Sequence, residues 1–168
     1  MKYLKEQQND YKTLSDLVKA LEANEITDFF IDDNNIIGET YIAEAVLLFT
    51  YALNTLDMIP DNQAREKHVL MGDYYFSEFY FALSQGGHMD IVYDMVTISK
   101  DLASKKSDIY ANTRMIDEHE LKYLLFAPLF YLIDNGYVSS TLYQVIDKYY
   151  KSLDKTALTY ITNIKGED

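Results

Sequence analysis

The chain has 168 residues, a length that predicts a single domain, and its hydrophobic fraction of 48% is high enough for a buried core and argues against disorder. It carries 27 Asp and Glu against 15 Lys and Arg, and the resulting net charge of −12 repels nucleic acid, anionic lipid and free phosphates. Cysteine is absent, which excludes disulfides and thiolate chemistry. No apolar run reaches the roughly 18 residues of a membrane span, and the N-terminal residues are too polar for a signal peptide, so we expect a cytoplasmic protein.

The spacing of apolar residues predicts helices along nearly the whole chain, and no stretch alternates as a strand does. A first helix is expected from about residue 10 or 13 to residue 23, then a short segment over 26–31 and a polar loop over 32–35. A long helix follows from about Gly38 to residue 58. Pro60 ends it, because proline has no amide hydrogen to donate.

The next helix, from Arg65 to the turn at Gly86 and Gly87, has a second half that is apolar on nearly every side. One apolar face comprises Leu70, Tyr74 and Phe81. Another comprises Met71, Tyr75, Phe79 and Ala82. Because a helix that is apolar all round must be covered all round, we expect it in the middle of a bundle or between the bundle and a partner chain.

Two residues inside this helix need a structural explanation. Gly72 costs about 1 kcal/mol relative to alanine in a helix interior, which predicts that another backbone passes close by. Asp73 is then a charge in an apolar setting, and it would need hydrogen-bond donors from a neighbour.

Four segments complete the predicted fold. One helix runs from Met89 to about Tyr110, and another begins at a capping box of Asp117 and Glu120, contains Pro128 as a kink, and ends at residues 135–136. A last long helix begins at residue 141, and residues 156–168 are expected to form a further short helix that frays. No repeat or linker divides the chain, so the sequence predicts one all-α domain over residues 1–168.

The sequence assigns no catalytic residue and no metal ligand. Its three histidines are scattered, no G-x-S-x-G elbow is present, and no glycine-rich phosphate loop occurs. Asp57 and Asp61 lie four residues apart, the spacing that puts two carboxylates on one helix face. However, Leu56 stands where a second adjacent carboxylate would be needed, and Pro60 interrupts the helix. We therefore interpret them as helix-end and loop carboxylates.

Residues 69–77 (VLMGDYYFS) resemble a segment of the small subunit of two-component all-trans polyprenyl diphosphate synthases, which make hexaprenyl or heptaprenyl diphosphate. The likeness extends back over residues 52–58 and forward over 98–110, and it covers roughly 38–110. The catalytic large subunits share the Gly-Asp segment and also carry two DDxxD motifs. Neither motif is intact in this chain.

The resemblance implies a helical domain similar to part of the trans-prenyltransferase (terpenoid synthase-like) fold. It implies a non-catalytic regulatory subunit that is inactive alone and binds no cofactor itself. In the implied heterodimer, the large subunit binds Mg²⁺, farnesyl diphosphate and isopentenyl diphosphate. The small subunit helps to set the length of a prenyl chain destined for quinones such as menaquinone.

The resemblance also implies two sets of contact residues. The set expected to contact the large subunit lies on the helix that carries the Gly-Asp segment and comprises Met71, Gly72, Tyr75, Glu78, Phe79 and Ala82. The set expected to line the product tunnel lies on the preceding long helix and comprises Leu48, Ala52 and Thr55.

Two other functions remain open from the residues alone. The chain could be a stand-alone helical adaptor or carrier, with an apolar ligand in its core and some of its sixteen tyrosines at the mouth, since tyrosine suits half-wet cavities. It could also be a self-sufficient enzyme acting on diphosphates, in which Asp57 would be essential.

Overall fold

The computed structural model describes residues 13–57, 63–112 and 115–154. Every regular element within these residues is helical, and one isolated antiparallel bridge joins Ile36 to Val138. The prediction of an all-α fold is therefore confirmed. In chain order the elements are α2 (Leu14–Ala20), α3 (Glu25–Ile31), the 3₁₀ turn η1 (Asp33–Asn35), α4 (Thr40–Asp57), α5 (Arg65–Gln85), α6 (Met89–Asn112), α7 (Glu118–Asp134) and α8 (Leu142–Ser152).

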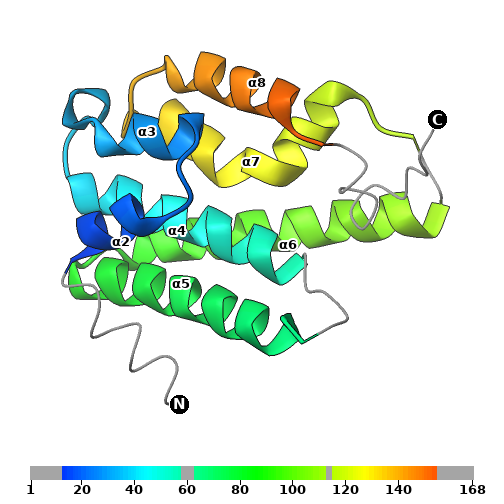
Figure 1. Cartoon of the computed structure of the whole chain (residues 1–168), viewed down its shortest axis with the longest axis horizontal. Coiled ribbons are helices and arrows are strands. Elements are labelled where there is room, and N and C mark those ends of the chain that lie inside the picture. Colours follow the sequence, from blue (N-terminus) through cyan, green and yellow to red (C-terminus); the bar gives the residue numbers. More distant parts are fainter. Residues whose placement is uncertain (1–12, 58–62, 113–114, 155–168) are drawn as a thin grey trace.

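The other elements surround α4 (Figure 1). Helices α3, α7 and α8 lie on one side of it, α5 runs along the opposite side, and α6 passes behind it in this view. Every residue from 42 to 50 is buried. This stretch includes Ala43 and Ala45, whose small side chains let neighbouring helices approach from several directions at once. The central helix of the bundle is therefore α4.

The prediction that the helix starting at Arg65 would be covered on every side within the bundle is wrong. Four residues of α5 are buried, namely Gly72, Tyr74, Phe79 and Leu83. Asp73 is exposed to solvent, so it needs no donors from a neighbour. The physical reason is that α5 packs closely along α4 on one side only, and its opposite side faces outward. Coverage of that outward side by a partner stays a prediction.

Helix ends in the first half follow local capping chemistry. Thr13 Oγ1 accepts a hydrogen bond from Asp16 N at 3.1 Å and starts α2, which ends at Ala20 rather than at residue 23. The long helix begins at Thr40 rather than at Gly38, because Gly38 has a φ of +81°, a left-handed conformation that a helix cannot include.

Helix ends in the second half agree more closely with the sequence. Asp117 Oδ1 accepts a hydrogen bond from Glu120 N at 2.8 Å, which confirms the predicted start of α7. Pro128 lies inside this helix, as predicted, and α7 bends in Figure 1. Helix α8 starts after Thr141, whose side chain makes no capping bond. The predicted break at Pro60 and the predicted helix over residues 156–168 lie outside the described residues.

One main hydrophobic core draws buried residues from all of the helices α2 to α8 that the structure describes, which supports a single domain over these residues. A smaller cluster of Leu17, Leu48 and Tyr74 joins α2, α4 and α5. None of the described helices is long and apolar enough to cross a membrane. The resemblance to the trans-prenyltransferase fold stays a prediction.

Candidate functional site

The segment that carries the family resemblance, residues 69–77, lies in α5 where this helix comes closest to α4. A Cβ atom added at Gly72 would stand 2.6 Å from both Cγ and Cδ2 of Leu56, near the end of α4. The close approach predicted at Gly72 is therefore present. It involves a side chain of α4 rather than its backbone.

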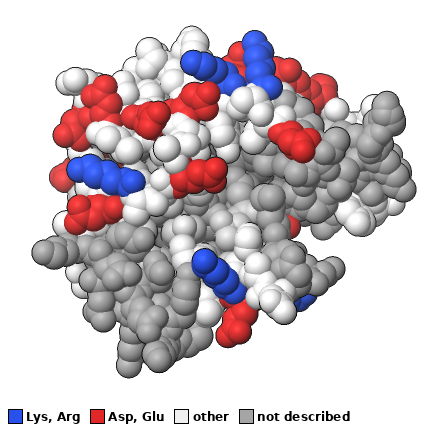
Figure 2. All heavy atoms as spheres, viewed as in Figure 1, with Lys and Arg blue, Asp and Glu red and all other residues white. Residues whose placement is uncertain are grey.

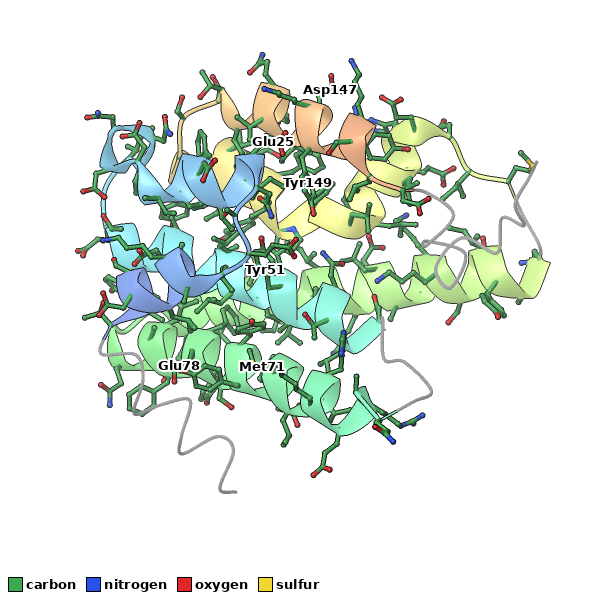
Figure 3. All side chains as sticks on the ribbon, viewed as in Figure 1. Glu25, Tyr51, Met71, Glu78, Asp147 and Tyr149 are labelled. Atoms are coloured by element: carbon green, nitrogen blue, oxygen red, sulfur yellow. The ribbon has the colours of Figure 1, made fainter. Side chains whose placement is uncertain are left out.

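The residues expected to contact a large subunit lie on the side and flank of α5 that face into this chain. Phe79 is fully buried, and its ring centre is 4.5 Å from that of Phe49 on α4. Gly72 is also buried. The other members of the set, Met71, Tyr75, Glu78 and Ala82, are half-buried; Figure 3 labels Met71 and Glu78 on α5. Burial raises the pKa of the Glu78 carboxyl above its ordinary value.

The more exposed side of α5 also carries aromatic side chains, of which the sequence singled out only Phe81. Phe76, Tyr80 and Phe81 are 40%, 45% and 60% exposed, and the exposed residues Asp73 and Ser77 lie among them. We call these five residues the outer face of α5. Phe76 lies at the edge of this face, since its ring centre is 6.0 Å from that of Phe49 on α4, and only the position of α4 shows which side of the helix is free.

The residues expected to line a product tunnel are placed differently from one another. Leu48 is fully buried against Leu17 and Tyr74, and Ala52 is also buried. Thr55 is half-buried and borders an open cavity. The structure therefore does not bring the three together around one open space.

This cavity has a volume of about 340 Å³ and lies beside the C-terminal half of α4. Its walls come from α4, α7 and α8, from the connection between α2 and α3, and from α5. The apolar part of the wall includes Leu21, Ile26, Leu47, Leu125, Phe126 and Leu129. The polar part includes Glu22, Thr50, Tyr51, Asn54, Thr55, His68, Tyr75 and Tyr149.

Two polar residues of this wall are held by hydrogen bonds from distant parts of the chain. Tyr51 Oη accepts a hydrogen bond from Asn24 Nδ2 at 3.2 Å, and Asn24 is itself held as the N-cap of α3. Asn54 Nδ2 donates to the carbonyl oxygen of Leu125 at 3.1 Å. That carbonyl lies in the turn before Pro128, where proline disturbs the helical hydrogen bonds.

Two tyrosines of the cavity, Tyr51 and Tyr149, stay protonated at neutral pH. Burial raises the pKa of Tyr51 to about 12, against the opposing effect of the hydrogen bond from Asn24. Burial also raises the pKa of Tyr149, and the carboxylates of Glu22 and Glu25 raise it further. Both phenols are therefore neutral groups with a hydrogen to donate.

Two carboxylates elsewhere on α4 have structural partners. Asp57, at the end of α4, forms an ion pair with Lys106 of α6, and it is a helix-end carboxylate as predicted. Glu44 is buried on α4 and accepts a hydrogen bond from Ser15 Oγ at 2.7 Å. Among the residues that the structure describes, no group of three His, Cys, Asp or Glu side chains is placed to hold a metal ion.

Comparisons of the chain with models of protein families, with curated proteins and with solved structures found no match.

Proposed function

We propose that this chain is the non-catalytic small subunit of a heterodimeric all-trans polyprenyl diphosphate synthase. The observation that carries the proposal is the coincidence of two features on α5. Residues 69–77 of this helix resemble the small-subunit segment, and the outer face of the same helix leaves Phe76, Tyr80 and Phe81 in solvent. Aromatic residues are enriched where protein surfaces bind one another.

In this proposal the large subunit covers the outer face of α5. It binds the Mg²⁺, the allylic diphosphate and isopentenyl diphosphate. The present chain forms one wall of the elongation tunnel and so helps to set product length. The outer face, rather than the inward-facing Gly72 and Phe79, is the part of α5 that is free for such a contact. The product is hexaprenyl or heptaprenyl diphosphate, for quinone side chains.

The proposal is tested by mixing the purified chain with the protein of the same genome that carries two intact DDxxD motifs. We expect the large subunit to make long prenyl diphosphates from farnesyl and isopentenyl diphosphates only when this chain is present. Chromatography of the dephosphorylated products measures their length. Equal rates and equal product lengths without this chain would contradict the proposal.

The contact surface is tested by the substitution Tyr80→Glu. Tyr80 is 45% exposed and makes no hydrogen bond within the described residues, so the folded chain has little need of its side chain. A carboxylate buried in the interface is costly, and we expect the Kd for the large subunit to rise by roughly tenfold or more. Titration calorimetry measures this change.

The matched control is Gln144→Glu, which adds the same charge on the exposed side of α8, across the molecule from α5 (Figure 1). We expect it to pair as the unchanged chain does. A Tyr80→Glu chain that is folded and pairs normally would show that the large subunit binds another surface.

A further inference from the structure

The cavity beside α4 has the size of a small ligand site, and it is separate from the outer face of α5. Ligand sites usually enclose about 300–1,000 Å³ and join apolar walls to polar groups that orient the ligand. This cavity encloses about 340 Å³ and its wall is mixed, with Leu47 of α4, Leu129 of α7 and Leu21 beyond α2 beside polar side chains such as Tyr51 and Tyr149.

Two hydrogen-bond donors converge on this space from different helices. Tyr51 projects from α4 and Tyr149 from α8 toward the gap between them (Figure 3). The Tyr51 hydroxyl accepts from Asn24, but neither hydroxyl hydrogen has an acceptor among the described residues. Both tyrosines line the same cavity, so an acceptor on a ligand bound there can meet their hydroxyls.

The charge of the wall selects against anions. Among the described residues that line the cavity there is no Lys or Arg, and Glu22 contributes a carboxylate. Glu22 and Glu25 both act on Tyr149 electrostatically. A diphosphate would have to leave water for a wall whose described residues include no Lys or Arg to pair with it, which is unfavourable.

We infer that this cavity binds an uncharged ligand with an apolar body and a carbonyl oxygen, which accepts hydrogen bonds from the hydroxyls of Tyr51 and Tyr149. The apolar body lies against the leucines and Phe126, and the carbonyl lies between the two phenols. This site goes beyond the proposed synthase function and does not depend on it, because all of its groups belong to this chain.

The test is calorimetric titration of the purified full-length chain, without a large subunit, with three probes that share a prenyl body. These are geranylacetone, a ketone; geraniol, an alcohol; and geranyl diphosphate, an anion. We expect geranylacetone to bind with the lowest Kd, geraniol to bind more weakly, and geranyl diphosphate to show no binding. No binding of geranylacetone, or binding of geranyl diphosphate as tight as that of the ketone, would overturn the inference.

The role of the two hydroxyls is tested by Tyr51→Phe and Tyr149→Phe, which remove one oxygen each and keep the rings. We expect each substitution to raise the Kd for geranylacetone by roughly three- to tenfold, the usual effect of one lost hydrogen bond. Tyr93→Phe, on the exposed side of α6, is the matched control and should leave the Kd unchanged. Unchanged binding in the double variant would also overturn the inference. Because no large subunit takes part, these outcomes are independent of the heterodimer experiment.

Discussion

Glu44 and Thr50 are the buried polar residues of α4, and each is satisfied in a different way. Thr50 Oγ1 donates to Val46 O at 3.0 Å, within its own helix. Glu44 is only 5% exposed and depends on Ser15 of α2 for a hydrogen bond. Burial, with a smaller contribution from Asp33, raises the pKa of Glu44 above its ordinary value of 4.5, although the Ser15 hydrogen bond acts in the opposite direction. The folded state therefore disfavours the ionised carboxylate.

The raised pKa of Glu44 leads to a prediction for the substitution Glu44→Gln. Because the folded pKa is raised, the contribution of Glu44 to stability is fully present below about pH 4.5 and is lost as the pH rises through the folded pKa. Glutamine cannot ionise and still offers Ser15 an acceptor oxygen. We expect Glu44→Gln to raise the melting temperature at pH 7 and to lose this advantage at lower pH. The exposed Glu39→Gln is the control, and a lower melting temperature for Glu44→Gln at pH 7 would refute the argument.

At the scale of the elements, the sequence anticipated a close neighbour at Gly72 but not that this neighbour belongs to α4. Gly72 was singled out because a glycine inside a helix needs a packing reason, and Leu56 supplies it. The face of α5 that stays in solvent could not be assigned in the same way. Both faces carry aromatic residues in the sequence, and the position of α4 decides between them, because it covers Phe79 and leaves Phe81 outside.

The close contact predicts that Gly72→Leu destabilises the chain. The added side chain would have to displace Leu56, and overpacking of this kind costs about 1–3 kcal/mol of unfolding free energy. Ser77→Leu, on the outer face of the same helix, is the control, and it should change stability by less than about 0.5 kcal/mol. Urea unfolding followed by circular dichroism measures both.

A second background makes the test specific for Leu56. In a Leu56→Ala chain the space beside Gly72 is larger, so Gly72→Leu should cost less there than in the unchanged chain. Equal losses in the two backgrounds would mean that the cost arises elsewhere.

At the scale of the whole molecule, the net charge of −12 dominates the surface. Acidic side chains outnumber basic ones on the face drawn in Figure 2. Some carboxylates are paired, as in the cluster of Lys122 with Glu118 and Asp147 at 2.8 and 2.5 Å. Lys122 is half-buried, but ion pairs that are fully exposed contribute little to stability, so mutual repulsion among the remaining carboxylates should govern the response to salt.

We therefore expect the melting temperature to rise as NaCl is increased from about 0.01 to about 0.2 M, which shortens the Debye length from about 30 Å to below about 10 Å. KCl should give the same rise, because screening depends on ionic strength. A melting temperature that falls with either salt would show that the ion pairs outweigh the repulsion.

The sequence by itself determined the helices, because apolar spacing and caps such as Asp117 act over a few neighbouring residues. It also predicted a close contact at Gly72, and it carries the resemblance that motivates the proposed function. Only the tertiary structure decided that α4 is the central helix, that the outer face of α5 is exposed, and that Tyr51 and Tyr149 line the same cavity. These three features depend on which residues are buried. A residue is buried by neighbours from distant parts of the chain, and the local sequence pattern does not specify those neighbours.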